Sequence, residues 1–235
     1  DAERGRSQAA AFWLLLPAML VLTVFLFLPV AASFAASLTD WDLYGLGDLG
    51  RVSYVGLRNY TRLFSDRIFL AGLRNTLVFA VIGVPLSVGL SLLVAVAINR
   101  RFLRGKAFFR AGFFIPVITT MVAVAIVWRW LYNPVYGVFN LVLALLGLPA
   151  QNWLSDPRLA LPALILMAVW KGFGYNVIIF VAAMQSIPES LYESIELDGA
   201  GSWQRLWYLT LPMLRRTLYF VAVMTTIGYL QFFAE

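Results

Sequence analysis

Cysteine and histidine are both absent from the 235 residues of this sequence. Without cysteine, the chain forms no disulfide bond and offers no thiolate ligand to a metal ion. Without histidine, it lacks the general base and the metal ligand that proteins use most often. Every acidic residue except Glu235 falls in a predicted loop or at the N-terminus, so no span carries the paired carboxylates that could serve catalysis. These absences argue against an enzyme and predict no metal site.

Charged residues are also scarce. They make up 13% of the chain, whereas soluble domains carry roughly 25%. Hydrophobic residues account for 61% of the sequence, and the mean hydropathy is +0.81. The composition therefore predicts a membrane protein rather than a soluble domain.

Several apolar runs are long enough to cross a bilayer as helices. They predict an all-α membrane protein, a polytopic helical bundle with five spans. The first run is far longer than a signal-peptide core of roughly 7–15 residues, and Pro17 and Pro29 are expected to kink it. The five predicted spans are 9–38, 76–98, 111–128, 159–185 and 217–234.

The distribution of basic residues predicts the orientation of the chain. The segment 99–110 carries five basic residues and no acidic one, which is typical of a cytoplasmic loop. A nucleic-acid site is the alternative, but the segment is too short between two spans to favour it. The leader 1–10 contains Arg4 and Arg6 and is also expected in the cytoplasm. Alternation then places 186–216 on the cytoplasmic side and 39–75 and 132–158 outside, with a short helix over 138–146 lying against the membrane. The five basic residues are Arg100, Arg101, Arg104, Lys106 and Arg110.

The loop 186–212 is the longest polar interval in the second half of the chain. Ser186 and Glu189 have the spacing of a capping box, which predicts a helix start. Gly199 and Gly201 can adopt positive φ and are expected to end that helix.

The same loop carries an acidic helix face. Glu189, Glu193 and Glu196 follow the i, i+4, i+7 spacing that places side chains on one face. A second short helix is expected over 202–209, and Pro212 then opens the next apolar run. The acidic face is either a solvated surface or a surface that docks into a partner protein.

Polar residues in the fourth and fifth spans are candidates for a solute path. Ionisable residues inside spans usually face the protein interior or an aqueous path and are functional. Lys171 lies roughly 18 Å along its span at 1.5 Å per residue, a depth that disfavours simple snorkelling to the interface. The alternative places Lys171 at the interface and Trp170 in the aromatic belt. The candidates are Trp170, Lys171, Tyr175, Asn176, Tyr229 and Gln231.

In the loop 186–212, Glu193 is followed at regular spacing by Asp198-Gly199-Ala200 and by Leu211-Pro212. This pattern resembles the EAA motif of binding-protein-dependent ABC importers, in the form found in carbohydrate permeases of the maltose and glycerol-phosphate type. The chain departs from that pattern at Ser194, Ile195, Leu206 and Leu209. Two short elements of the same family have counterparts here. The segment 56–60 resembles the element G-L-x-N-Y, and the segment 73–76 resembles the element L-x-N-T. In the family this loop is the coupling helix, which fits a cleft on the ATP-hydrolysing subunit. The residues that match the motif, and that the resemblance implies for coupling, are Glu193, Asp198, Gly199, Ala200, Leu211 and Pro212.

The resemblance covers 11–235 and implies a permease of the type I importer fold, with a sixth span expected beyond Glu235. It implies sugar import across the cytoplasmic membrane of a prokaryote by alternating access. It also implies a second permease subunit, two ATPase subunits, a solute-binding protein and a lipid bilayer as partners, with no nucleic acid.

The chain has no G-x-x-x-x-G-K-[ST] pattern, so ATP and Mg²⁺ are expected on the ATPase subunits and no cofactor on this chain. A permease for phosphate, amino acids or peptides is the alternative within the family. A secondary transporter is a further alternative, disfavoured because its ion coupling would require acidic residues inside the spans.

Overall fold

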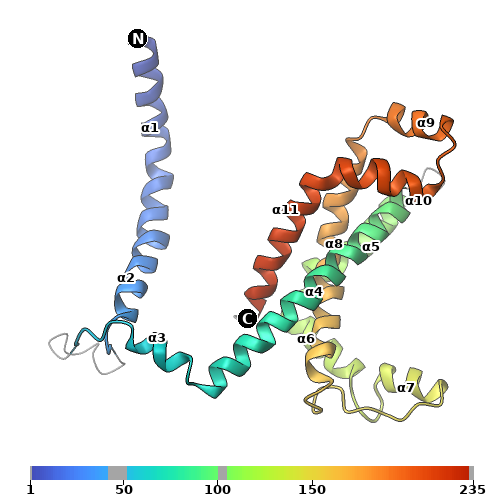
Figure 1. The fold of residues 1–235 in the computed structure, drawn as a ribbon, viewed down its shortest axis with the longest axis horizontal. Coiled ribbons are helices and arrows are strands. Elements are labelled where there is room, and N and C mark those ends of the chain that lie inside the picture. The colour runs from blue at the N-terminus through green and yellow to red at the C-terminus, as the bar shows by residue number, and fades with distance from the viewer. Residues whose placement is uncertain (1, 42–51, 100–104, 233–235) are drawn as a thin grey trace. The chain divides into compact units, whose positions relative to one another are not determined.

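The computed structural model describes residues 2–41, 52–99 and 105–232 as helices joined by turns (Figure 1). Within these ranges the chain forms no β-strand, only an isolated antiparallel bridge between Thr39 and Tyr54. The prediction of an all-α protein is therefore confirmed. The chain divides into two compact units, Asp1–Gly72 and Leu73–Glu235.

The first predicted span is a helix with a π segment in its middle. It consists of α1 (Ala2–Leu22), η1 (Thr23–Phe27) and α2 (Leu28–Ser37), and its apolar part is long enough to cross a bilayer. Pro29 lies in the first turn of α2, directly after the π segment. Its ring would clash with the carbonyl four residues earlier in a regular α-helix, and local π geometry is one way in which membrane helices accommodate proline.

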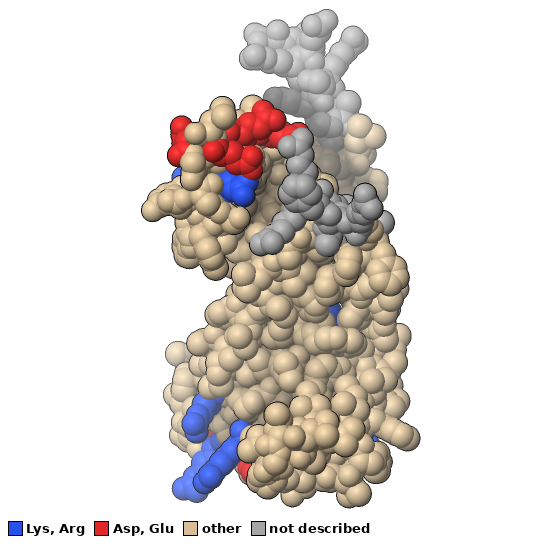
Figure 2. Space-filling view, turned by 90° about the vertical axis from the view of Figure 1, so that its right-hand side faces the viewer, with Lys and Arg blue, Asp and Glu red and all other residues tan. Residues whose placement is uncertain are grey.

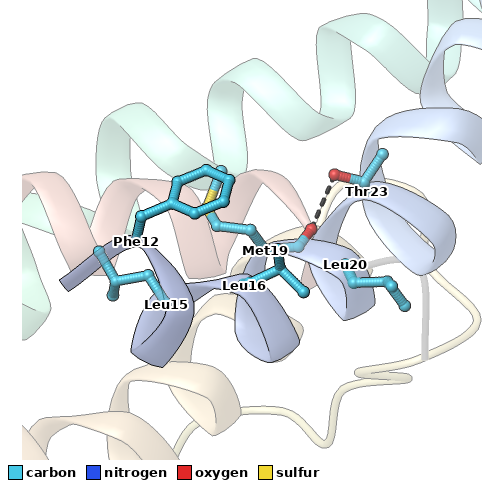
Figure 3. Close-up of a pocket in the computed structure, with 6 residues that line it drawn as sticks. All are labelled: Phe12, Leu15, Leu16, Met19, Leu20 and Thr23. Carbon is cyan, nitrogen blue, oxygen red and sulfur yellow. Dashed lines mark hydrogen bonds between the residues drawn. The ribbon is translucent and has the colours of Figure 1, made fainter. Parts of the chain in front are cut away.

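The surface of this span is apolar and open. No side chain between Phe12 and Ser37 is buried within the chain. A shallow hollow of about 450 Å³ runs along α1 (Figure 3), and Thr23 Oγ1 closes one end by donating a hydrogen bond of 2.7 Å to the Met19 carbonyl. Such a surface suits contact with lipid chains or with another membrane helix. The hollow is lined by Phe12, Leu15, Leu16, Met19, Leu20 and Thr23.

A short helix, α3 (Arg58–Leu63), holds the end of the first span. Asn59 Nδ2 donates hydrogen bonds to the carbonyls of Ser37 and Thr39, at 2.9 and 2.7 Å. The Tyr60 hydroxyl lies 2.7 Å from Ser37 Oγ. Two residues of the G-L-x-N-Y element thus satisfy polar groups at the C-terminal end of α2, which a helix leaves without intrahelical partners.

The second span, α4 (Arg67–Asn99), begins nine residues before its predicted start at 76. Asp66 explains the early start, because Asp66 Oδ1 accepts the backbone N–H groups of Ile68 at 2.8 Å and of Phe69 at 3.4 Å. The predicted outer segment 39–75 is therefore helical over its last residues.

The third predicted span is wrong as a single helix. The chain forms α5 (Lys106–Ile118) and α6 (Met121–Leu131), which are bent by 106° relative to each other. Thr119 and Thr120 are extended at the break, and Thr120 Oγ1 caps α6 by accepting the Ala123 N–H at 3.4 Å. The signal in the sequence was the Thr-Thr pair after Pro116, since threonine favours N-cap positions.

The fourth span, α8 (Ala160–Gln185), is confirmed and forms the centre of the second unit. Its side chains Phe180 and Val177 are fully buried, and they share a core with Leu214 and Val221 of α11 (Leu211–Leu230). Helix α5 packs along α8. At one end of this unit, α7 (Val138–Leu145) confirms the short helix predicted in the loop 132–158. Figure 1 shows α7 and the α9–α10 region at opposite ends of this unit.

The described residues do not test the predicted number of five spans. Three described helices are long and apolar enough to cross a bilayer, and the bent pair α5–α6 brings the number to four if it counts as one span. Helix α11 does not meet the same criterion, because its first turns contain Arg215 and Arg216. Five spans therefore remain a prediction. Arg100, Arg101 and Arg104, which carry the predicted orientation, and the end of the fifth span at 233–234 lie outside the described residues.

Gly174 controls how closely α8 approaches α5. A Cβ atom at Gly174 would lie 1.8 Å from the Phe113 carbonyl oxygen, whereas a Cβ atom at Gly172, one half-turn away, would meet no atom within 4 Å. We expect Gly174→Ala to lower the free energy of unfolding by about 1–3 kcal/mol, because the backbone of α5 or of α8 must move to admit the added methyl group. Gly172→Ala should leave it unchanged or raise it by up to about 1 kcal/mol. Unfolding in mixed detergent micelles measures both, and equal stability of the two variants would contradict this packing.

Candidate coupling loop and solute path

The loop 186–212 contains the predicted first helix, α9 (Glu189–Leu197), but not the predicted capping box. Pro188 occupies the N-cap position and provides no side-chain hydrogen bond. Ser186 instead donates its hydroxyl to the Ala183 carbonyl at 2.8 Å, at the end of α8. The capping box does not form because Ser186 lies two positions before the N-cap and its hydroxyl is already bonded to the preceding helix.

The end of α9 is a Schellman turn formed by the D-G-A residues. Gly199 has φ +77°, as predicted, and its N–H donates to the Glu196 carbonyl at 3.0 Å. The Ala200 N–H donates to the Ile195 carbonyl at 3.1 Å. This pair of hydrogen bonds requires a residue with positive φ at the position of Gly199, for which glycine carries no steric penalty. Gly201 has φ −70°, so the prediction of positive φ there is wrong.

The second predicted helix does not end before Pro212 but continues into the fifth span. It consists of α10 (Ser202–Arg205), the π segment η4 (Leu206–Thr210) and α11, and the residues at both junctions are helical. Gln204 Oε1 accepts the Gly201 N–H at 2.7 Å and so secures its start. Leu211 is half-buried and Pro212 is exposed in the first turn of α11.

Acidic and apolar side chains are exposed together on this loop. Figure 2 shows the acidic side chains gathered at the end of the second unit, with a basic group beside them. Glu193 and Asp198 are exposed, whereas Glu196 forms an ion pair with Arg205 of α10. Leu197 is 89% exposed. Exposed apolar side chains beside charged ones are typical of surfaces that bind another protein. Three large aromatic side chains are exposed in the same region, namely Trp203, Trp207 and Tyr208.

Lys171 connects the fourth span to the break between α5 and α6. Its Nζ donates a hydrogen bond of 3.3 Å to the carbonyl of Thr119, which ends α5. A cation is favourable at a helix C-terminus, where carbonyl groups are left without intrahelical partners. Trp170, beside it, is 39% exposed and stacks edge-to-face on Trp128 of α6, with ring centroids 5.5 Å apart.

Asn176 joins three helices in the interior of the second unit. Asn176 is 5% exposed, and its Nδ2 donates to Thr225 Oγ1 of α11 at 3.0 Å and to Ser87 Oγ of α4 at 3.5 Å. Ser91 of α4 donates to the Phe173 carbonyl of α8 at 3.0 Å. The two serines were missed in the sequence, where a serine in an apolar run gives no signal of its partner.

Tyr229 is the second buried candidate. Its ring packs against Gly83 so closely that a Cβ atom there would lie 2.4 Å from a ring carbon. Its hydroxyl lies beside Ser87 without an aligned hydrogen bond, and it has no partner among the described residues. Tyr175 and Gln231 are exposed, so the structure does not bring all six candidates into one site.

The comparisons with known proteins identify the family. The model of the family described as "Binding-protein-dependent transport system inner membrane component" matches residues 69–234. The chain belongs to this family. It is 34% identical to the lactose transport system permease protein LacF of Rhizobium radiobacter, over 95% of this chain and 74% of that protein. It is 34% identical to the trehalose/maltose transport system permease protein MalF of Thermococcus litoralis, over 97% and 76%.

A solved structure agrees in fold. The crystal structure of a bacterial ABC transporter involved in the import of the acidic polysaccharide alginate superposes with a TM-score of 0.77 at 26% identity, over 97% of this chain and 77% of that one. The chain is therefore a multi-pass membrane permease of the ABC importer class, a transport component with the type I importer fold.

The two polar candidates Asn176 and Gln231 should differ in their effect on stability. Asn176→Leu keeps the branched shape of the side chain but leaves the Thr225 hydroxyl and Ser87 without this donor, so the free energy of unfolding should fall by about 1–3 kcal/mol. Gln231→Leu changes an exposed side chain and should alter it by no more than about 0.5 kcal/mol. Denaturation of both variants in mixed micelles tests this, and a stable Asn176→Leu protein would exclude a structural role for the contact.

Proposed function

We propose that this chain imports a sugar or sugar-like polyol across the cytoplasmic membrane of a prokaryote by alternating access, driven by ATPase subunits that dock on the loop 186–212. The observation that carries the proposal is the geometry of this loop. A Schellman turn at Gly199 folds α9 back toward α10, and exposed acidic and apolar side chains lie side by side on it.

The partners follow from the family and from the sequence. Two ATP-binding cassette subunits supply the ATP and Mg²⁺ sites, since the chain has no phosphate-binding loop. A second permease subunit completes the path, and a solute-binding protein delivers the solute to the outer face. The alginate transporter is also known in complex with an alginate pentasaccharide-bound periplasmic protein, at 26% identity and a TM-score of 0.72. Arg4 and Arg6 of the leader 1–10 and the basic segment 99–110 favour a cytoplasmic N-terminus.

The solute class is supported by the relatives. Their names specify lactose, trehalose or maltose, and sn-glycerol 3-phosphate, the last for UgpA of Agrobacterium fabrum, which is 32% identical over 92% of this chain and 72% of that protein. All four solutes carry several hydroxyl groups. Trp170 and Tyr175 supply partly exposed aromatic rings that can stack on a sugar, and Lys171 supplies a donor that suits hydroxyl or anionic groups.

Gly199 provides a direct test of the docking role. Gly199→Ala must adopt φ +77°, which costs an L-residue about 1–2 kcal/mol. We expect uptake and the ATPase stimulation by the loaded binding protein to fall several-fold while the subunit still inserts. Gly201→Ala, at φ −70°, should retain both activities. Uptake at wild-type rate by the Gly199→Ala complex would remove the support for docking through this turn.

The solute class is tested with the whole importer in liposomes. The binding protein is loaded in turn with radiolabelled lactose, maltose and sn-glycerol 3-phosphate and is added to the liposomes. We expect the liposomes to take up at least one of these solutes, and only when ATP is present on the side of the ATPase subunits. Accumulation of phosphate, an amino acid or a peptide and of none of these three would contradict the sugar assignment.

A further inference from the structure

Two contacts tie α9 to the helix that follows it. On the outside, Glu196 forms the ion pair with Arg205 of α10. Deeper in the loop, the Tyr192 hydroxyl lies 3.2 Å from Thr210 Oγ1, at the last residue of the π segment η4. Tyr192 and Glu196 are four residues apart in α9, so they lie on one face of that helix. This face is turned toward α10 and η4.

The direction of the inner contact can be assigned. Thr210 Oγ1 donates its only proton to the Arg205 carbonyl at 3.2 Å, so the Tyr192 hydroxyl is the donor to Thr210 Oγ1. The hydrogen bonds therefore run from Tyr192 through Thr210 to the Arg205 backbone. Consecutive hydrogen bonds of this kind polarise and strengthen one another. Arg205 is thus bound to α9 twice, once by its guanidinium through Glu196 and once by its carbonyl through Thr210.

The inner contact is protected from solvent, whereas the outer one is not. Thr210 is 6% exposed, and Tyr192 packs against the core cluster that contains Leu214 of α11. The side chains of Arg205 and Glu196 are 29% and 56% exposed. Exposed ion pairs are weakened by salt and by the entropy of two long side chains. The Tyr192–Thr210 hydrogen bond is therefore the more rigid of the two connections.

A rigid connection between α9 and α10 matters because the backbone segment that joins them can change its conformation. Between α9 and α10 the backbone passes only through a turn that contains Gly199 and Gly201, and glycine adapts its backbone easily. Thr210 continues directly into α11, which carries Thr225 in contact with Asn176. The π segment ending at Thr210 fits this role, since π segments occur often at functional sites.

We propose that Tyr192 and Thr210 are positioning residues that make α9 and α11 move as one body. A displacement of α9 by an ATPase subunit then reaches α11 and its buried contact with α8 instead of being absorbed in the glycine turn. This inference rests on the proposed function, because it assigns how the docking loop is joined to the transport path.

The test measures how much solute enters per ATP hydrolysed. The complete importer is reconstituted in liposomes with radiolabelled lactose or maltose, whichever the wild-type complex imports. Tyr192→Phe removes only the hydroxyl, and we expect the import-to-hydrolysis ratio to fall about five-fold or more, the lower end of coupling between distant sites. Thr210→Val should have the same effect, Thr210→Ser should preserve the ratio, and the double variant should lose no more than either single variant.

A matched control separates coupling from loss of a tyrosine hydroxyl in general. Tyr219→Phe makes the same chemical change on α11, at a side chain that is 72% exposed, and should leave the ratio at its wild-type value. Unchanged ratios in Tyr192→Phe and Thr210→Val would overturn the inference. A parallel fall in assembled complex, hydrolysis and import, with the ratio preserved, would reduce the contact to a structural role and would also overturn it. A wild-type complex that neither hydrolyses ATP in response to loaded binding protein nor imports solute would instead remove the proposed function and this inference with it.

Discussion

A bilayer offers no hydrogen-bonding partner to the backbone, and each N–H and C=O group inside it must find one within the protein. This constraint explains the regular helices of the spans, whereas two π segments among the described residues accompany proline. η1 (Thr23–Phe27) and η4 (Leu206–Thr210) are each followed by a Leu-Pro pair, ending in Pro29 and Pro212. In both places the π geometry spans the residue whose carbonyl the proline ring would otherwise strike, so the helix continues past the proline without breaking.

Where a span does break, polar side chains of a neighbouring helix or of the break itself satisfy the backbone. Lys171 binds the Thr119 carbonyl at the end of α5, and Thr120 caps the start of α6. The close approach of α5 and α8 at Gly174 brings the two helices into contact near this site. Asn176 of α8 also finds its hydrogen-bonding partners on neighbouring helices, since it donates to the hydroxyl groups of Ser87 on α4 and Thr225 on α11. Polar residues in the spans therefore hold the bundle together.

The sequence predicted the helical class, the span at α8 and the D-G-A turn, because each depends on local chemistry such as apolar length or glycine at positive φ. It did not predict the break after Ile118. The apolar pattern is continuous there, and the bend depends on Thr120 acting as the N-cap of α6. It assigned Ser186 to the wrong helix, because a serine can bond to the helix behind it as well as to the helix ahead. The partners of Asn176 come from residues 49 and 89 positions away, and no local pattern specifies such contacts.

Crosslinking of single-cysteine variants tests the central claim that the loop 186–212 docks on the ATPase subunits. The chain contains no cysteine, so each variant has one reactive site. Leu197→Cys lies on the exposed end of α9, and Leu145→Cys lies on α7 at the other end of the same unit, with exposures of 89% and 80% in the native side chains. With a short bifunctional reagent in native membranes, Leu197→Cys should yield a crosslink to an ATPase subunit and Leu145→Cys should not. A crosslink to the ATPase from Leu145→Cys, or none from Leu197→Cys in an active importer, would contradict the claim.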